Sequence, residues 1–203
     1  PLRSYLPPVV FSNVGNMGLP LCYFAFGNEG LGLAVGFYLV YAVFQFTVGP
    51  LFQGREAAWR TLITTPVIYA AAIGLLLLTT GSALPLWLDN TVELLAGVAI
   101  PLMTIALGHA LGSFTVRRFG ISLGMSVMRL VIGFSAGLVL VEILNFEGTM
   151  RGVMIIQAAM PVAVFNYLLA ARYQRHPDDV AGAIVVSTLI SFVSLPFLLR
   201  LAL

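Results

Sequence analysis

The stretch of sequence that decides the fold lies near the N-terminus and reads Phe11-Ser12-Asn13-Val14-Gly15-Asn16-Met17-Gly18-Leu19-Pro20-Leu21. It places two asparagines and a proline inside an apolar run long enough to cross a lipid bilayer. Proline has no backbone N–H, and its ring clashes with the carbonyl oxygen four residues earlier, which here belongs to Asn16. We therefore predict that the helix in this stretch is broken at Pro20.

A second stretch of the same kind lies near the other end of the chain and reads Ile155-Ile156-Gln157-Ala158-Ala159-Met160-Pro161-Val162-Ala163-Val164-Phe165-Asn166. Its proline is Pro161, and the carbonyl that this proline frees belongs to Gln157, which also carries a side-chain amide. Each stretch is followed by an acidic loop, at Glu29 and at Asp178-Asp179, and then by one more apolar helix. This weak internal repeat predicts a second broken helix at Pro161.

The composition places nearly the whole chain in lipid. Its mean hydropathy is +1.00 and only 9% of its residues are charged, whereas soluble domains carry about a quarter charged residues. A net charge of +2 is too small and too scattered for a nucleic-acid-binding face. The single cysteine, Cys22, excludes an intrachain disulfide, and the two histidines have no third ligand spaced for a metal. We predict no metal site and no cofactor.

Apolar segments of spanning length divide the chain into about seven transmembrane helices. The predicted fold class is therefore an all-α membrane protein. The expected helices cover residues 5–26, 30–52, 61–80, 90–112, 119–144, 150–173 and 179–200. Short polar connections separate them, and we expect Asp178 and Asp179 to lie in one such solvated loop and to cap the last helix.

The arginines predict how the chain lies in the membrane, because basic loop residues are retained on the cytoplasmic side. Three alternate loops carry them, at Arg55 and Arg60, at Arg117 and Arg118, and at Arg172 and Arg175. The start of the chain is therefore expected in the cytoplasm, and its C-terminus on the outer side.

The two predicted broken helices run in opposite directions across the membrane. Four expected helices lie between them, so the two broken helices are five helices apart along the chain. Because successive spanning helices alternate in direction, an odd offset means that the second copy runs opposite to the first. An inverted repeat whose discontinuous helices meet near the midplane is typical of secondary transporters. The alternative is a pair of ordinary proline kinks whose amides only satisfy the freed backbone groups.

The groups around the two prolines are the candidate substrate-binding groups. The predicted site consists of Asn13, Asn16, Pro20, Gln157, Pro161 and Asn166. Its amides offer hydrogen-bond donors and acceptors to a substrate. The N-terminal ends of the second half-helices add partial positive charge, which suits a carboxylate.

Two further residues are candidates for a charge role. Arg129 lies inside the fifth expected helix, where a charge is costly and usually faces the bundle interior or a cavity. It could attract an anion, or it could pair with Glu142 or Glu93. His109 lies near the end of the fourth expected helix and could titrate, although a structural hydrogen bond is the alternative.

The stretch from Ser12 to Leu21 resembles the first crossover of the auxin efflux carrier family, which includes plant PIN-formed proteins and bacterial organic-anion permeases. The stretches Ile100-Pro101-Leu102-Met103-Thr104-Ile105-Ala106-Leu107-Gly108, Ala159-Met160-Pro161-Val162-Ala163 and Ser187-Thr188-Leu189 also resemble this family. The matches run along nearly the whole chain, and the Asn/Gly/Pro stretch is the most specific of them.

The resemblance implies a fold of two inverted five-helix repeats whose crossing broken helices form the substrate site. On that template, residues 1–52 are the last two helices of the first repeat, and the N-terminal helices of that repeat are absent. Residues 53–60 are a cytoplasmic linker, and residues 61–203 are a complete second repeat. Asn13, Asn16 and Pro20 match the first crossover, and Pro161 matches the second.

The implied function is alternating-access transport of a small organic anion, such as a dicarboxylate, across a bacterial inner membrane. One alternative is a symporter of the bile-acid sodium symporter type, and the candidate coupling ions are Na+ and H+. Another is a non-transporting truncated fragment, which could complete itself as a homodimer. We expect no enzymatic activity, because the sequence has no paired intramembrane aspartates and no serine motif with a histidine placed to activate it.

Overall fold

The computed structural model describes residues 5–52 and 65–202 of the 203-residue chain. Every regular element in these two ranges is a helix, and their one pairing of extended backbone is an isolated antiparallel bridge between Ser12 and Val162. The linker predicted at residues 53–60, with Arg55 and Arg60, lies outside the described residues. The predicted all-α fold class is confirmed.

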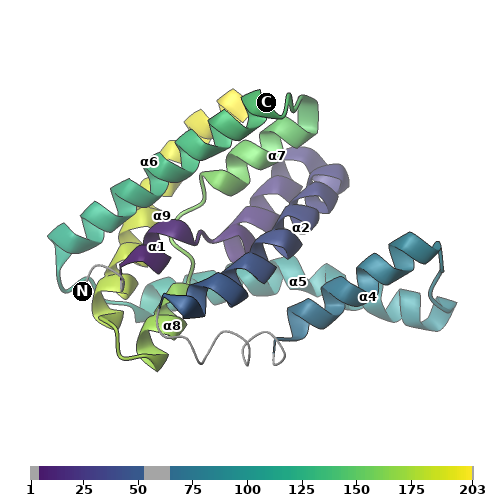
Figure 1. The fold of residues 1–203 in the computed structure, drawn as a ribbon, viewed down its shortest axis with the longest axis horizontal. Helices are drawn as coiled ribbons and strands as arrows, with labels where there is room; N and C mark the ends of the chain where they lie inside the picture. The colour runs from purple at the N-terminus through teal and green to yellow at the C-terminus, as the bar shows by residue number, and fades with distance from the viewer. Residues whose placement is uncertain (1–4, 53–64, 203) are drawn as a thin grey trace.

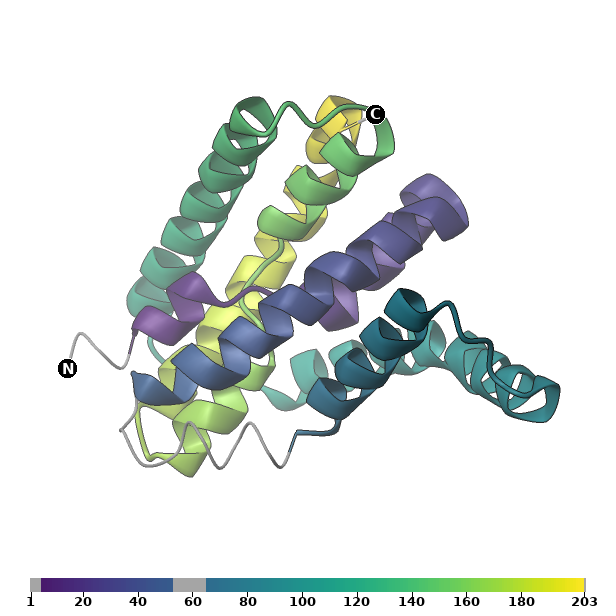
Figure 2. The same cartoon turned by 45° about the vertical axis from the view of Figure 1, so that its right-hand side comes forward.

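The N-terminal region contains three helical elements and a sharp turn. These are α1 (Leu6–Val10), the π-helix η2 (Val14–Gly18) and α2 (Leu19–Leu51). Inside α2, Gly27 adopts φ 63° and ψ −149°, which divides the helix into two arms. A positive φ is tolerated by glycine because it has no Cβ. The chain doubles back at this turn (Figures 1 and 2), between the first two predicted helices.

The middle of the chain forms an arm that projects from the rest of the molecule. It consists of α4 (Pro66–Thr80) and the first part of α5 (Leu86–Ser113), which extend away from the other helices in both ribbon views, whereas the later part of α5 returns to pack against η2 (Figures 1 and 2). None of the side chains of α4 is buried, and Leu107 is the buried side chain of α5. Because these helices are apolar on all sides, their outward faces suit lipid rather than water.

The C-terminal half of the chain forms the packed part of the molecule. It contains α6 (Phe119–Ile143), α7 (Gly148–Ala158), α8 (Phe165–Arg172) and α9 (Pro177–Ala202). Helix α6 packs against α7 and α9, and the N-terminal α2 also packs against α7. Phe11, Ile156 and Met160 are fully buried between these elements. The core therefore lies where the N-terminal segment crosses the C-terminal helices.

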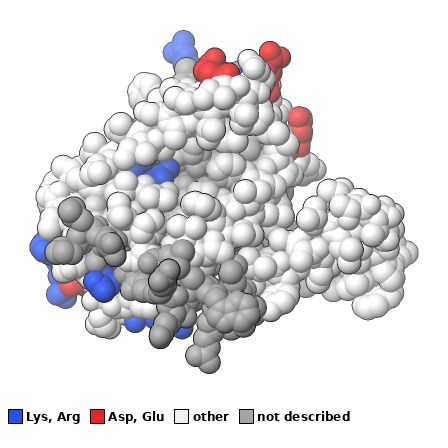
Figure 3. Space-filling model, in the orientation of Figure 1, with Lys and Arg blue, Asp and Glu red and all other residues white. Residues whose placement is uncertain are grey.

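Four helical segments in the described ranges are long and apolar enough to cross a membrane: Val14–Gly49, Leu86–Ser113, Phe119–Ile143 and Pro177–Arg200. Helix α4 is a shorter apolar helix. On the face shown in Figure 3, most charged atoms gather at the top and at the lower left, and a broad uncharged surface lies between them. This distribution is the one expected of a protein that is embedded in a bilayer.

The N-terminal helix is interrupted earlier than we predicted. Helix α1 ends at Val10 and η2 begins at Val14, whereas Pro20 is the second residue of α2 and lies within helical structure. The prediction of a break at Pro20 is therefore wrong. The π-helix η2 runs directly into α2, and the N–H of Leu19 already bonds to the carbonyls of Val14 and Gly15, so Pro20 follows a π-turn and does not begin a helix. The π-helix that precedes Pro20 also gives the backbone a wider turn.

Candidate functional site

Two non-helical stretches, residues 11–13 and residues 159–164, meet at the centre of the packed helices. The backbone N–H of Asn13 donates to the carbonyl of Pro161 at 2.7 Å, and the N–H of Ala163 donates to the carbonyl of Phe11 at 3.1 Å. These two bonds flank the Ser12–Val162 bridge. The second stretch contains Pro161, as the sequence predicted, whereas Pro20 is not part of this contact.

Neutral side chains from two long helices satisfy further backbone groups of these stretches. The N–H of Ser12 donates to the hydroxyl oxygen of Tyr41, which lies on α2. The N–H of Val162 donates to Oγ of Ser187 on α9 at 3.1 Å. Because an unsatisfied backbone group in hydrocarbon costs several kcal/mol, these partners make the interruptions compatible with a position inside the membrane.

Asn166 lies directly at the meeting point of the two stretches. Its Nδ2 donates to the carbonyl of Phe11 at 2.9 Å, while its buried Oδ1 has no hydrogen-bond partner among the described residues. One of the predicted substrate-binding amides therefore holds the two stretches together. Its Oδ1 and the second N–H of its Nδ2 remain available for further hydrogen bonds.

The side chain of Arg129 on α6 contacts the same region from the other side. Its guanidinium donates to the carbonyls of Val9 at 3.0 Å, Val10 at 2.7 Å and Ala158 at 2.7 Å. The predicted pairing with Glu142 is not formed, because Glu142 accepts a hydrogen bond from Arg151 at 2.9 Å. Arg129 therefore faces the bundle interior, as a costly intramembrane charge is expected to do.

A cavity of about 240 Å³ lies beside the meeting point. Asn13 and Asn16 line it at the start of η2, Tyr38 and Gln45 line it from the second arm of α2, and residues 163–165 line it at the start of α8. The cavity therefore lies at the N-terminal ends of two helical segments. These ends carry partial positive charge, because their first backbone N–H groups lack intrahelical acceptors.

Two buried amide nitrogens beside this cavity have no hydrogen-bond acceptor in the part of the chain that the structure describes. They are Nδ2 of Asn13 and Nε2 of Gln45, and both residues are at most 5% exposed. Buried amides are normally hydrogen-bonded, so an unmatched pair of donors needs an explanation. A ligand oxygen could accept from these nitrogens only if the two side chains turned them toward the cavity, because both nitrogens are buried in this conformation.

The other predicted site residues lie apart from this cavity. Gln157 is fully buried, packs against Gly18 of η2, and has no partner among the described residues for either side-chain amide atom. Pro20 lines a second cavity of about 240 Å³, where η2 and α2 face α5, and Asn16 borders both cavities. His109 is exposed on α5 and lines neither cavity.

Sequence reasoning missed three polar residues on the second arm of α2. Tyr38, Tyr41 and Gln45 follow the spacing of one helix face, and they meet the cavity or the first interruption. A signal was present, because polar residues recurring every three to four positions in an apolar helix mark a face turned toward protein. The predicted site was placed in the two stretches around Pro20 and Pro161 and not on this helix.

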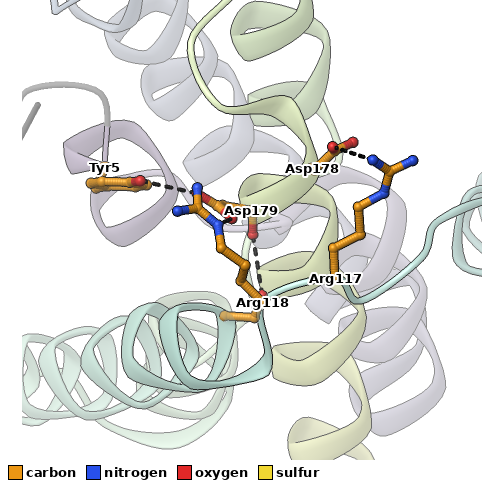
Figure 4. Close-up of polar contacts among 6 residues, drawn as sticks. Tyr5, Arg117, Arg118, Asp178 and Asp179 are labelled. Carbon is orange, nitrogen blue, oxygen red and sulfur yellow. Dashed lines mark hydrogen bonds and ion pairs between the residues drawn. The ribbon is translucent and has the colours of Figure 1, made fainter.

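A charged cluster lies away from the cavity, where α1, α6 and α9 begin (Figure 4). Asp179 is only 1% exposed, so its predicted place in a solvated loop is wrong. It accepts hydrogen bonds from Nε of Arg118 at 2.7 Å, from Nη2 of Arg118, and from the hydroxyl of Tyr5 at 3.0 Å. Hydrogen bonding to Asp179 raises the pKa of the Arg118 guanidinium above its ordinary value.

Next to it, Arg117 and Asp178 form an ion pair at 3.2 Å, with both side chains more than half exposed. No group of three His, Cys, Asp or Glu side chains placed to hold a metal ion occurs in the described ranges. The candidate site is therefore the cavity and the contact beside it.

Comparisons with known proteins identify the family. The model of the family described as membrane transport protein matches residues 51–199. Uncharacterized transporters of Methanothermobacter thermautotrophicus and Methanocaldococcus jannaschii are 31% and 24% identical, and each alignment covers 91% of this chain and 63% of the relative. The chain thus spans just under two thirds of the length of these two relatives.

Plant proteins are also similar to the chain. Auxin efflux carrier component 8 of Arabidopsis thaliana is 28% identical over 141 residues, which is 66% of this chain and 38% of that protein. Auxin efflux carrier component 1 of the same plant is 27% identical over 143 residues. The family match covers most of the chain and identifies the family that the sequence resembles, although the Asn/Gly/Pro stretch at residues 12–21 lies outside the matched residues. The chain therefore belongs to the membrane transport protein family of the auxin efflux carriers.

Proposed function

We propose that this protein takes part in secondary transport of a small organic anion, such as a dicarboxylate, and binds it in the cavity beside Asn13 and Gln45. The observation that carries the proposal is the pair of buried amide nitrogens without acceptors at this cavity. A carboxylate has two oxygens that accept hydrogen bonds, and it would match these donors. The helix N-termini at the same cavity favour a negative charge.

The size of the cavity narrows the substrate class. At about 240 Å³, it lies below the range of roughly 300–1,000 Å³ that holds drug-sized ligands. It suits an anion of a few carbon atoms, and malonate and malate are the dicarboxylates that we propose to test first. Neither acidic nor basic side chains line this cavity, so binding would depend on amides and helix ends.

The fold supports an alternating-access mechanism for this proposal. In this proposal, the non-helical stretches at residues 11–13 and 159–164 would be the interruptions of two crossing helices of an inverted repeat, whose site lies where they meet. Asn16 borders the substrate cavity and also the second cavity, which faces α5. Movement of α5 relative to η2 would then open the site to one side of the membrane at a time.

The test is uptake of labelled malonate or malate by the complete gene product in liposomes. Gln45→Leu removes the unmatched amide at nearly constant volume, and Asn13→Ala removes its neighbour. We expect at least a tenfold loss of uptake in Gln45→Leu, because each buried hydrogen bond to a charged ligand contributes about 1.5–3 kcal/mol.

The matched control is Thr47→Val, on the same arm of α2. Thr47 donates to the carbonyl of Val43 in its own helix at 2.7 Å and does not line the cavity. Uptake should be retained in this variant. Wild-type uptake in both Gln45→Leu and Asn13→Ala would overturn the proposed site, and repeating the assay with and without a sodium gradient would identify sodium coupling.

A further inference from the structure

Arg129 joins two helix ends that are far apart in the sequence. Val10 is the last residue of α1 and Ala158 is the last residue of α7. One guanidinium reaches both ends, because Nη1 donates to the carbonyls of Val9 and Val10, and Nη2 donates to the carbonyl of Ala158. The Arg129 side chain therefore bridges the last turns before the two non-helical stretches.

Both ends need hydrogen-bond donors of this kind. The last carbonyls of a helix have no intrahelical partner, and they form its partially negative end. Protein covers most of this region, since Val9 is 9% exposed and Arg129 is 5% exposed. Val10 is 38% exposed, and its carbonyl also accepts a hydrogen bond from the hydroxyl of Tyr41 at 3.2 Å. A single cation that donates to both ends meets this need without a second ion, which would bring its own desolvation cost.

No nearby carboxylate among the described residues competes with the helix-end carbonyls for the Arg129 guanidinium. Among the acidic side chains that the structure describes, none lies within the 4.0 Å limit of an ion pair with Arg129. Gly133, one turn further along α6, makes the space, because a Cβ at this position would overlap both Nη2 of Arg129 and the carbonyl of Ala158. The close approach of α6 to the end of α7 depends on this glycine.

We propose that Arg129 is the positioning residue of the crossover: it holds the ends of α1 and α7 together and thereby keeps residues 11–13 against residues 159–164. A lysine could not replace it fully, because a single ammonium group lacks the planar fork of donors that reaches two ends at once. The consequence for transport rests on the proposed function, whereas the positioning itself can be measured without any substrate.

Two cysteine pairs can report on this positioning in the complete gene product, with Cys22 replaced by alanine. Ser12→Cys with Val162→Cys probes the contact itself. These residues form the non-hydrogen-bonded pair of an antiparallel bridge, whose Cα atoms typically lie about 4.5 Å apart and can be joined by a disulfide. Ser122→Cys with Gly182→Cys probes distant packing of α6 on α9, where a Cβ at residue 182 would lie 3.2 Å from Cβ of Ser122.

The measurement is the rate of disulfide formation in each pair under mild oxidation in detergent. Arg129→Gln should slow the Ser12/Val162 pair roughly tenfold, because the charged donors to two helix ends are lost, and should leave the Ser122/Gly182 pair unchanged. Arg129→Lys should restore part of the rate. Gly133→Ala should slow the same pair while keeping the charge, and it replaces Arg129→Gln if that variant does not fold.

Arg151→Gln is the matched control. It removes the same charge from an arginine that also joins α6 and α7, through its ion pair with Glu142 at 2.9 Å, and it should leave both rates unchanged. Equal slowing of both cysteine pairs in Arg129→Gln would show general loosening and would overturn the proposal. So would parental rates in both Arg129→Gln and Gly133→Ala. These outcomes do not depend on whether the protein transports malonate or malate.

Discussion

Two arginines, one at the start of α6 and one in its middle, have different kinds of hydrogen-bond partner. Arg118 stands immediately before α6, where its side chain is 53% exposed and pairs with the carboxylate of Asp179. Arg129 lies about 16 Å further along, at 1.5 Å per helical residue. It is 5% exposed, and its guanidinium donates to three backbone carbonyls. The arginine at the start of α6 is thus paired with a carboxylate, and the arginine in the middle of α6 is hydrogen-bonded to the carbonyls of two helix ends.

The difference shows how burial selects the partner of a charge. At the edge of the bundle, water still solvates the half-exposed guanidinium of Arg118. The carboxylate of Asp179 is buried there, and the guanidinium together with the hydroxyl of Tyr5 supplies its hydrogen bonds. In the middle of α6, a second ion would have to be desolvated completely. The carbonyls at the ends of α1 and α7 are already present there and need donors. Nη1 and Nη2 of the guanidinium satisfy them, whereas its buried Nε has no partner among the described residues.

The largest effect that we expect comes from Arg129→Leu. The carbonyls of Val9, Val10 and Ala158 lose a charged donor, and of these the Val10 carbonyl keeps the hydroxyl of Tyr41. An unsatisfied buried polar group costs about 1–3 kcal/mol, so the free energy of unfolding should fall by several kcal/mol. Thermal unfolding of the complete gene product in detergent measures this change. Arg151→Leu serves as the control, and an equal loss in both variants would contradict the distinction between the two arginines.

A smaller effect is expected from Asp179→Asn, which keeps the shape of the side chain and removes its charge. The exposed guanidinium of Arg118 regains water when the pair is broken, so the melting temperature should fall less than in Arg129→Leu. A double-mutant cycle with Arg118→Gln measures the coupling of the two residues. If the two single changes were additive, the ion pair would contribute no stability of its own.

Replacing Ser187, a neutral hydrogen-bond partner of the stretch at residues 159–164, should lower the stability by a smaller amount. In Ser187→Ala, the N–H of Val162 loses its acceptor at 3.1 Å, and we expect a loss of about 1 kcal/mol in stability. The melting temperature should then fall by about 2–4 °C for a protein of this size. Thr188→Ala is the matched control, because Thr188 donates only within its own helix, to Ile184 at 2.7 Å. A similar loss in both variants would contradict this account.

The smallest effect belongs to Arg117→Ala. Its pair with Asp178 is 3.2 Å long, and the two side chains are 70% and 57% exposed. Exposed pairs of this kind contribute at most a few tenths of a kcal/mol in many cases, and salt weakens them further. The melting temperature should stay within experimental error of the parent at both low and high salt. A loss as large as that of Asp179→Asn would show that burial does not decide the worth of these pairs.

Much of the fold could be predicted from local sequence. The turn at Gly27, the helices of the C-terminal half and the non-helical stretch at Pro161 all agree with the helices and breaks expected from apolar length and from proline. Pro20 did not behave in this way, because it follows the π-helix η2, whose wider turn continues directly into α2. The non-helical stretch at residues 11–13 contains no proline, so local chemistry alone did not place it.

The candidate site was predictable only in part. Asn13 and Asn16 line the cavity, as the choice of amides near the first proline anticipated. Gln157, which was also predicted to bind substrate, packs against Gly18. Gln45 lines the cavity, but it lies outside the two repeated stretches, so the repeat did not predict it. The reason is that an amide's neighbours across the bundle depend on which helices pack together, and helix period alone does not specify that pairing.

The sequence by itself determined that this is an apolar, all-helical chain, because apolar length and the scarcity of charge act locally and need no partner. It also determined its family, through motifs that survive in the linear order of residues. Only the tertiary structure decided which groups meet: the bridge between Ser12 and Val162, and the three carbonyls around Arg129. Hydrogen bonds between distant segments form only when the packed helices bring donor and acceptor within about 3 Å of each other.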